Sequence, residues 1–574
     1  MRKKQLIVLI AIVLVALGVR VWKLNSVPSS LYVDEIDLGY QARSLVETGR
    51  DYRGGLSPFF VKSFNSDRTP IPAILTAITT AIFKTPELAI RMAPAILGTI
   101  GVVLSYLLVN MWIGMGPALV TAMAMALSPW MIQFGRIGFE ATSVMVILLG
   151  GLTSFFYWLK NKKKEKFFWL AVILLSLSMY TYRTMSLLTP IIFLILLTVY
   201  HQEIFKLEKK KLLIAAGLAG IIMGSFLYAT TLASADETRI SQISILADPE
   251  TAIWVQRDRE IASGDLNDNT VGKQATLTSK IFYNKPLSWA DSLLNNYLTA
   301  FSTDFLFING DPNLRQSIPG WGMMIWLDVI AIGFGIYFFV KKRKQKWVQL
   351  LTLWLLTSPL ASCLTTIGGN HAHRLFVMAI PLLVLTGIGW YQFGVSLWST
   401  KAKKFNYGKI LVVATALIWL GWWSRFYQSY MVHYPISSSR WFGGGYKEAM
   451  LTIKEVEDDY EAVRLTDSLD PPMLYYFWWT EVPPKAVQEY GSNFSEEVYK
   501  GTELDKVKPI NWQEEMKKEK CQNWDECIKE GTLYLLSTNE VKEDLRTEKP
   551  PKGIKLIKTI LYPDKEPAFY LISR

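Results

Sequence analysis

The sequence contains few cysteines and few charged residues for its length. Three cysteines in 574 residues exclude a small scaffold held together by several disulfides. Charged residues make up 19% of the chain, whereas 51% of the residues are hydrophobic and the mean hydropathy is +0.21. Soluble domains usually have a charged share of about a quarter. This composition excludes a disordered chain and disfavours a single soluble globule.

Long apolar runs are concentrated in one part of the chain and nearly absent from the rest. They recur from Leu6 to Trp423, at lengths close to the roughly 20 residues that a membrane-spanning helix needs. Almost none follow Trp423. We therefore predict an α-helical polytopic membrane protein with a transmembrane domain at 1–425 and a soluble α/β domain at 426–574.

The net charge of +12 lies mostly in short basic segments between the apolar runs. These segments are 2–4, 160–166, 206–211, 341–346 and 401–409. Outside them the chain carries a net negative charge. Short basic loops between spans are typical of the cytoplasmic side of a membrane protein, so nucleic acid is not needed as a partner to explain them.

The basic segments also predict a topology. If all are cytoplasmic, an even number of spans must separate each neighbouring pair. The stretch 71–83 is short and begins at Pro70 and Pro72, so we predict a re-entrant or interfacial helix on the outer side. The N-terminus is then cytoplasmic, and the first span is an uncleaved anchor in the cell membrane. The 11 predicted spans are 6–22, 88–110, 117–134, 141–159, 167–182, 186–200, 212–230, 322–340, 347–363, 375–397 and 410–424.

This topology places two groups of charged residues in the first outer loop. Asp34 and Glu35 precede apolar residues at helical spacing, which predicts a position near the start of an interfacial helix. Their charges can serve the helix dipole instead of a substrate. Asp67 and Arg68 lie directly before Pro70, where a plain surface turn is the alternative to a site.

Three further outer turns carry candidate residues. Arg136 and Glu140 are four residues apart and share a face if the turn is helical, either as an ion pair or as site residues. Tyr182 and Arg183 end a span, where an arginine can simply extend to the membrane interface.

The last of these turns contains His371, His373 and Arg374. The two histidines could bind metal, but no third ligand is near them in sequence, and a cationic cluster that attracts an anion fits more easily. Carboxylates and arginines from separate outer turns would converge at one membrane face. This pattern predicts an outward-facing active site for an anionic, membrane-resident substrate.

The arrangement resembles the GT-C glycosyltransferases that use polyprenyl-phosphate sugars, particularly the bacterial aminoarabinose transferases and the protein O-mannosyltransferases. Asp34 and Glu35 match their Asp-Glu pair in the first outer loop, and 40–49 matches the small-residue helix after it. The segment 67–70 matches their acidic-basic-x-Pro element, with arginine where lysine is frequent. Glu140 matches a second acid, commonly Asp, and Arg183 loosely matches a basic residue. The resemblance covers about residues 1–400.

The resemblance implies sugar transfer from a polyprenyl phosphate to a protein, lipid or glycan acceptor, and it leaves a divalent metal ion possible. The chemistry supports the same residue types. A phosphate leaving group needs positive charge, and an acceptor hydroxyl needs a base. We expect Asp34 to be the base and the product to be inverted at C1. Arg68, Arg183 and Arg374 would hold the phosphate. Glu35, Asp67 and Glu140 would orient groups or bind an ion, and the further candidates for donor binding are Arg136, Tyr182, His371 and His373.

A transporter or flippase for an anionic lipid is the alternative. It should place ionisable residues near the bilayer midplane and contain internal repeats. We find no repeat, and the candidate residues cluster at one face, which favours the enzyme. The loop 301–315 is rich in aromatic and acidic residues and could line a sugar or acceptor site, or be an ordinary packed loop.

The composition of the tail predicts a small α/β domain. We expect strands at Ala462–Thr466, Thr532–Ser537, Lys555–Leu561 and 568–572, and helices at 446–457 and 471–479. Cys521 and Cys527 can form a local disulfide outside the cytoplasm, and free thiols or an incomplete metal site are the alternatives. Cys363 lies in a predicted span and should be buried. The domain either recognises an acceptor or caps the catalytic face.

Overall fold

The computed structural model describes residues 3–63, 67–231, 243–262, 276–398, 407–489, 504–541 and 543–574. The chain forms two compact units. Unit 1 comprises Met1–Ala16, Leu97–Gln133 and Ala141–Ser424, and unit 2 comprises Leu17–Ile96, Phe134–Glu140 and Arg425–Arg574. One boundary lies next to the predicted start of the soluble domain, and the predicted first outer loop belongs to the same unit as the tail.

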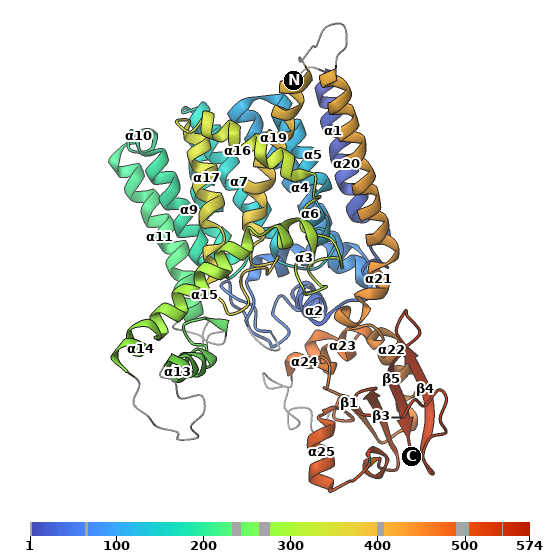
Figure 1. Cartoon of the computed structure of the whole chain (residues 1–574). Helices are drawn as coiled ribbons and strands as arrows, with labels where there is room; N and C mark the ends of the chain where they lie inside the picture. Colours follow the sequence, from blue (N-terminus) through green and yellow to red (C-terminus); the bar gives the residue numbers. More distant parts are fainter. Residues whose placement is uncertain are drawn as a thin grey trace. The chain divides into compact units, whose positions relative to one another are not determined.

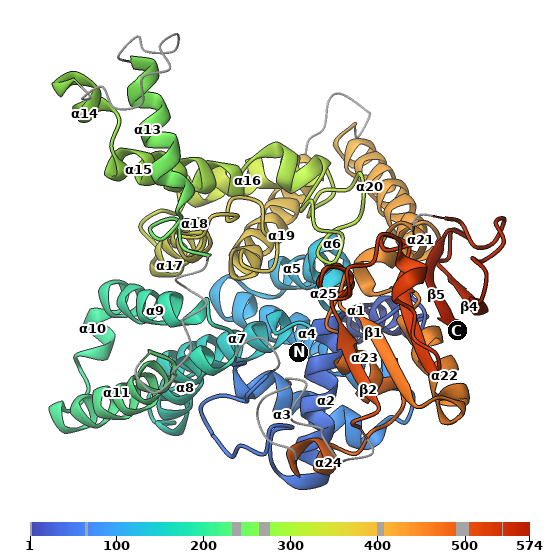
Figure 2. The same ribbon diagram turned by 90° about the horizontal axis from the view of Figure 1, so that it is seen from below.

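Unit 1 is helical, and the figures show its long helices side by side (Figures 1 and 2). Helix α8 packs between α7 and α11, while α19 packs against α5, α16 and α17. The elements of unit 1 are α5 (Met115–Leu127), α6 (Pro129–Phe134), α7 (Ala141–Lys160), α8 (Lys166–Leu177), η1 (Ser178–Tyr180), α9 (Met185–Val199), α10 (His201–Ile204), α11 (Lys209–Thr231), α13 (Glu250–Ala262), α14 (Leu277–Phe282), α15 (Lys285–Ala300), η2 (Asp304–Ile308), α16 (Asp328–Lys341), α17 (Lys346–Thr357), α18 (Leu360–Cys363) and α19 (Phe376–Trp398). Three long helices, α1 (Lys3–Val21), α4 (Pro86–Ile113) and α20 (Tyr407–Val432), contain residues of both units, and the last residue of α6, Phe134, belongs to unit 2.

The apolar helices confirm a membrane protein of the predicted helical class. In the described residues, six helices are long and apolar enough to cross a membrane: α1, α4, α7, α11, α19 and α20. Four shorter apolar helices accompany them at Pro70–Ile82, Met115–Leu127, Lys166–Tyr180 and Met185–Val199. The count of 11 spans and the side on which each end lies stay predictions.

The predicted span 117–134 is not one continuous helix. Helix α5 ends at Leu127, and Ser128 has an extended ψ of 132°. Pro129 then begins α6. A residue before proline is disfavoured in the helical region, because the proline ring collides with its backbone. The break releases the backbone N–H of Trp130, which donates to the carbonyl oxygen of Met323 at 3.1 Å.

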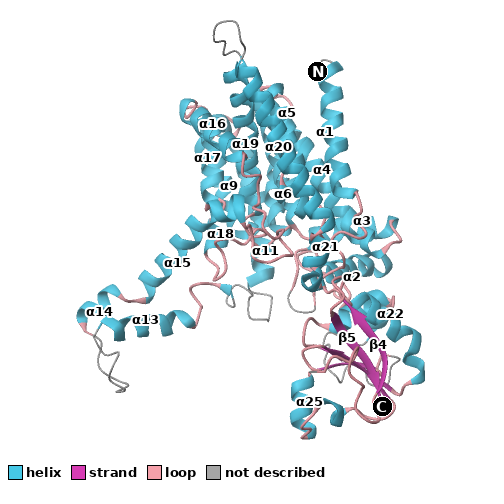
Figure 3. Ribbon diagram, turned by 45° about the vertical axis from the view of Figure 1, so that its right-hand side comes forward, coloured by secondary structure: helices cyan, strands magenta, loops and turns pink. Residues whose placement is uncertain are grey.

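Unit 2 contains the strands of the described chain, and Figure 3 shows them in one sheet. The strand order is β2-β1-β3-β5-β4. Strand β1 pairs in parallel with both β2 and β3, and β5 pairs antiparallel with both β3 and β4. The elements of unit 2 are α2 (Val33–Thr48), α3 (Pro70–Ile82), α21 (Tyr434–Ser437), η3 (Ser439–Phe442), α22 (Tyr446–Val456), η4 (Glu457–Asp459), β1 (Ala462–Thr466), α23 (Pro472–Trp479), α24 (Pro484–Glu489), β2 (Val507–Ile510), α25 (Trp512–Glu519), η5 (Trp524–Cys527), β3 (Thr532–Ser537), β4 (Lys555–Leu561) and β5 (Pro567–Ser573).

Both faces of this sheet are covered. Alternate residues of β3 enter different cores: Leu533 and Leu535 pack with α22 and α23, whereas Tyr534 and Leu536 pack with α25 and η5. This follows from the two-residue period of side chains along a strand. The sheet and its helices confirm the predicted α/β character of the tail.

The predicted strands and helices of the tail are present, and the structure adds strand β2 and helices α24 and α25. Strand β2 contains Pro509, which cannot donate a ladder hydrogen bond. The strand lies at the edge of the sheet and pairs only with β1, where a proline is tolerated. Cys521 and Cys527 form the predicted disulfide, and Cys363 is buried with no exposed surface.

Candidate active site

The central feature of unit 2 is one guanidinium group that meets three carboxylates. Asp34 and Asp37 lie three residues apart, on one side of the first turns of α2. Arg68 donates to Asp34 from Nη2 and to Asp37 from Nε. Its Nη1 donates to Oε1 of Glu140 at 3.2 Å. The cluster joins Asp34, Arg68 and Glu140, which the sequence analysis had selected, and adds Asp37.

A short backbone bridge holds Arg68 in this position. Val61 and Arg68 form an antiparallel pair, and each N–H donates to the other's carbonyl oxygen at 2.9 Å. Thr69 is the N-cap residue of α3, and Pro70 begins that helix, since a proline loses no helical bond in the first turn. Asp67 is partly buried next to Arg68.

Asp37 anchors the cluster from the interior. Its side chain is only 2% exposed and accepts three bonds. Besides Arg68, the donors are the hydroxyl of Tyr52 at 2.5 Å and the hydroxyl of Ser63 at 2.7 Å. Burial, together with the charge of Asp37, raises the pKa of Tyr52 well above its usual range, so this phenol stays a donor.

Asp34 is the most accessible of the three carboxylates. Its side chain is 38% exposed, compared with 2% for Asp37 and 13% for Glu140. Burial by itself lowers the pKa of Arg68, but the negative charges of Asp37, Asp34 and Glu140 outweigh it and hold that pKa well above its usual range. Arg68 is therefore a permanent cation, and the four groups together carry a net charge of about −2.

Glu35 faces away from this cluster. Both Glu35 and Arg91 are fully buried, and the guanidinium of Arg91 binds the carboxylate at 2.9 and 2.8 Å. The backbone N–H of Gly138 also donates to Glu35, at 2.9 Å. These contacts fix α2 to α4 and to the segment 134–140, so Glu35 is part of the scaffold around the cluster.

Arg136 and Glu140 do not share a helical face, because α6 ends at Phe134 and the turn after it is irregular. The expected pairing on one face is therefore wrong. The buried guanidinium of Arg136 donates to the carbonyl oxygens of Val19, Arg20 and Val27 at 2.8 to 3.0 Å. The first two carbonyls belong to the last turn of α1, where a cation satisfies unpaired acceptors and the helix dipole.

The other predicted residues, Tyr182, Arg183, His371, His373 and Arg374, belong to unit 1. The ring of His373 stacks on that of Tyr182, with centroids 4.4 Å apart. Arg374 donates to Thr365 at 2.6 Å and to the carbonyl of Ile367 at 3.1 Å. Arg183 is partly buried at the start of the turn into α9.

Two buried residues of the loop after η2 hold the turn that contains His371 and His373. Asp311 accepts from the N–H of Ala372 at 2.7 Å, and Gln316 accepts from the N–H of His373 at 2.8 Å. Burial raises the pKa of Asp311 to about 6, although the bond from Ala372 opposes the shift. Asp311 belongs to the aromatic and acidic segment 301–315 of the sequence analysis. Its carboxylate binds the turn that contains Ala372, in the same unit.

The carboxylate cluster does not fit the divalent metal ion that the sequence left open. In the parts of the chain that the structure describes, no three His, Cys, Asp or Glu side chains are placed to hold a metal ion. Arg68 lies among Asp34, Asp37 and Glu140 and supplies the positive charge that an ion would otherwise supply.

Sequence reasoning missed Asp37, Tyr52, Arg91, Asp311 and Gln316 as parts of these clusters. A signal existed for Asp37, because it follows Asp34 by three residues on a predicted helix. For Arg91 and Gln316 no local signal existed, since their partners lie 56 and 57 residues away in the chain.

Residues 67–227 match the family model described as dolichyl-phosphate-mannose-protein mannosyltransferase. The structure of ArnT from Cupriavidus metallidurans bound to undecaprenyl phosphate matches with a TM-score of 0.54 and 10% identity, covering 100% of this chain and 98% of that chain. The chain has the GT-C fold. This finding confirms the predicted resemblance and fold class.

A second solved structure supports the GT-C fold. The archaeal oligosaccharyltransferase AglB from Archaeoglobus fulgidus, in complex with an inhibitory peptide and a dolichol-phosphate, matches with a TM-score of 0.51 and 14% identity. The match covers 84% of this chain and 64% of AglB, so the chain spans less than two thirds of that protein's length. No curated protein matches the sequence.

Proposed function

We propose that this protein is a membrane glycosyltransferase that moves a sugar from a polyprenyl-phosphate donor to a hydroxyl acceptor on the extracytoplasmic face, with inversion. The GT-C fold and the lipid phosphates bound to AglB and ArnT in the two similar solved structures support the class of donor. The observation that carries the assignment to residues is the partly exposed carboxylate of Asp34, held by Arg68 at the start of α2.

The proposed reaction is a single displacement. Asp34 accepts the proton of the acceptor hydroxyl, and the hydroxyl oxygen forms a bond to C1 of the sugar. The bond from C1 to the phosphate oxygen breaks, and its electron pair leaves with the polyprenyl phosphate. Because the oxygen attacks opposite the leaving group, the configuration at C1 is inverted.

Asp37 and Glu140 act through Arg68 in this proposal. Asp37 is too buried to meet a substrate, and together with Tyr52 and Ser63 it fixes the plane of the guanidinium. A guanidinium has five N–H groups, and the three carboxylates take three of them. We propose that the other two N–H groups donate to the donor phosphate.

The cluster's net negative charge repels a phosphate, so the donor requires further cations. We retain Arg183 and Arg374 as the proposed phosphate ligands, with Tyr182, His371 and His373 as further donor-binding residues. The acceptor is a protein, lipid or glycan hydroxyl. Glu35 and Arg136 are better explained as scaffold residues, because buried groups of this chain already bind the Glu35 carboxylate and the terminal nitrogens of Arg136.

The decisive experiment incubates the purified protein in detergent with a panel of polyprenyl-phosphate sugars and measures the release of polyprenyl phosphate. We expect Asp34→Asn to lower kcat by about 100-fold or more, which is the usual contribution of a general base. Glu47→Gln is the matched control, because Glu47 is an exposed carboxylate on the same helix that pairs with the partly buried Arg43 at 2.7 Å. Its kcat should stay within about twofold of the parent, as for an exposed ion pair.

Wild-type turnover by Asp34→Asn would disprove the assignment of the base. Absence of turnover with every donor would favour the alternative, a transporter or flippase for an anionic lipid.

A further inference from the structure

One side of helix α2 carries carboxylates of the cluster, and another side packs against the C-terminal domain. We propose that this domain is the support that holds α2, and with it Asp34, in place, and that Tyr40 and Gln488 are the positioning residues. The structural part of the inference stands by itself, whereas its consequence for catalysis rests on the proposed function. The sequence leaves open whether this domain recognises an acceptor or caps the catalytic face, and the contacts with α2 favour a supporting role.

A single hydrophobic core joins α2 to the tail. Leu31, Ile36, Tyr40, Tyr52 and Ile90 are fully buried in the same cluster as the residues of α22, α23 and one face of the sheet. The cluster therefore has contributions from the first outer loop and from a segment more than 350 residues later. Burial of this apolar surface is the main force that keeps α2 against the tail.

Tyr40 is the most constrained residue in that contact. Its hydroxyl is buried and donates to the carbonyl oxygen of Val482 at 3.0 Å. Its ring stacks on Phe477 of α23, with centroids 5.8 Å apart. The preceding residue, Gly39, allows the close approach, because a Cβ there would lie 3.1 Å from the Trp478 ring and 2.5 Å from Ile90.

Gln488 of α24 fixes the far end of the same helix. Its amide nitrogen lies 3.0 Å from the hydroxyl of Ser44, 2.8 Å from the hydroxyl of Thr48 and 2.8 Å from the carbonyl oxygen of Asp51. The amide has two N–H groups, so these three acceptors share them, and they mark the C-terminal end of α2 and the turn after it. One side chain of the tail therefore holds both the last turn of the helix and its exit.

The tail also contacts the chain just before α2. The hydroxyl of Ser30 donates to the carbonyl oxygen of Gly443 at 3.4 Å. The ring of Tyr32, the N-cap residue of α2, meets Phe442 edge to face at 5.6 Å. The helix is thus held at its beginning, middle and end by one domain, and a shift of that domain must move the carboxylate of Asp34.

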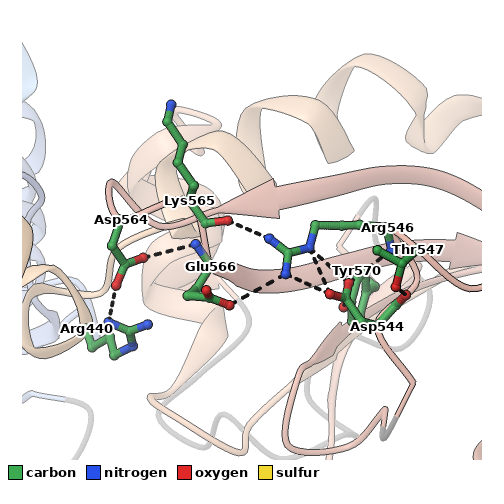
Figure 4. Close-up of polar contacts among 8 residues, drawn as sticks. All are labelled: Arg440, Asp544, Arg546, Thr547, Asp564, Lys565, Glu566 and Tyr570. Carbon is green, nitrogen blue, oxygen red and sulfur yellow. Dashed lines mark hydrogen bonds and ion pairs between the residues drawn. The ribbon is translucent and has the colours of Figure 1, made fainter.

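Other polar groups of the domain pair with one another on its surface. Figure 4 shows such a group: Arg440 binds Asp564 at 2.5 Å, and Arg546 binds Asp544 at 2.7 Å. Arg440 also lies over the ring of Tyr562, which packs against the core that contains α2. The Arg546–Asp544 pair has no member in that core, so Arg546→Ala provides a control in the same domain.

The test measures backbone hydrogen exchange in the full chain, with Gln488→Ala, Tyr40→Phe and the double variant. For the double variant we expect exchange in residues 33–48 to become about tenfold faster, because two anchoring contacts are lost, while β1 and β3 keep their protection. Arg546→Ala should leave residues 33–48 unchanged. In the transferase assay, kcat should fall about tenfold while KM for the donor stays within about twofold.

Unchanged exchange in residues 33–48 of the double variant would overturn the inference, and so would equal loss of protection throughout the domain. Faster exchange without any transferase activity in the parent protein would leave the support role standing and refute the proposed function. A fall in kcat with no change in exchange would show that the tail acts on the reaction in another way and would also overturn the inference.

Discussion

At the scale of single residues, acidic side chains only a few positions apart lie in different environments. Asp34, Glu35 and Asp37 lie within one turn of α2, yet the Asp34 side chain is 38% exposed, whereas the other two are buried. Glu35 pairs with Arg91, and Asp37 pairs with Arg68. Removing one partner of a buried pair typically costs about 3–5 kcal/mol, so Glu35 and Asp37 are under structural constraint. Of these three acids, only Asp34 combines a charge partner with an exposed side chain.

Asp311 provides a residue-scale prediction about pH. Burial raises the pKa of Asp311 from the ordinary 3.8 to about 6. The folded protein therefore binds the carboxyl proton of Asp311 more tightly than the unfolded chain does. The resulting stabilisation is fully present below pH 3.8 and is lost as the pH rises through about 6. Asp311→Asn removes the titration, so its apparent Tm relative to the wild type should be higher at pH 8 than at pH 5.

Thermal unfolding in detergent at the two pH values checks this expectation. Asp564→Asn is a suitable control, since Asp564 is on the surface. Desolvation raises the pKa of Asp564, but the bond to Arg440 and the backbone bonds outweigh it and keep that pKa below its usual value. A Tm difference between Asp311→Asn and the wild type that is equal at both pH values would contradict it.

At the scale of elements, the site depends on how closely α2, α4 and the turn after α6 approach one another. Gly138 lies where they meet: its N–H binds Glu35, and an added Cβ would lie 2.8 Å from Ile90 and 3.2 Å from Glu35. A side chain there requires the Ile90 side chain to shift and presses on the Glu35 side chain. The packing around Gly138 therefore favours a residue without a side chain.

Gly138→Ala should destabilise the fold by about 1–3 kcal/mol, the usual cost of overpacking, and should lower transferase activity together with stability. The matched variant is Gly217→Ala in α11, where no atom lies within 4 Å of the added Cβ. Replacing a helical glycine by alanine at such a position should raise stability by about 0.5–1 kcal/mol. Thermal unfolding of the two variants would refute the packing argument if both shifted in the same direction.

At the scale of the whole molecule, the basic segments and the disulfide predict opposite sides of the membrane. Lys163 lies in a basic segment predicted to be cytoplasmic, and Lys529 is an exposed residue of the tail close in sequence to the Cys521–Cys527 disulfide. Both side chains are accessible, and the one remaining cysteine of the sequence, Cys363, is buried.

Single cysteines therefore report the topology against a low background. In intact cells, a membrane-impermeant thiol reagent should label Lys529→Cys, whereas Lys163→Cys should react only after permeabilisation. The contrast in labelling should be at least about tenfold, because a charged reagent does not cross the bilayer core. Labelling of Lys163→Cys in intact cells would refute the predicted orientation of the spans.

The sequence by itself determined the helical membrane class, the helix that carries Asp34 and most strands of the tail, and it offered the local disulfide as one of three alternatives. Each of these depends on periodicity, composition or partners a few residues apart. The tertiary structure decided which charges meet: Glu35 with Arg91, Asp37 with Arg68, and Arg136 with the carbonyls of α1. It also decided that Tyr40 binds Val482, 442 residues away. Such pairings arise from the burial of distant apolar faces against each other, which leaves no pattern within either segment alone.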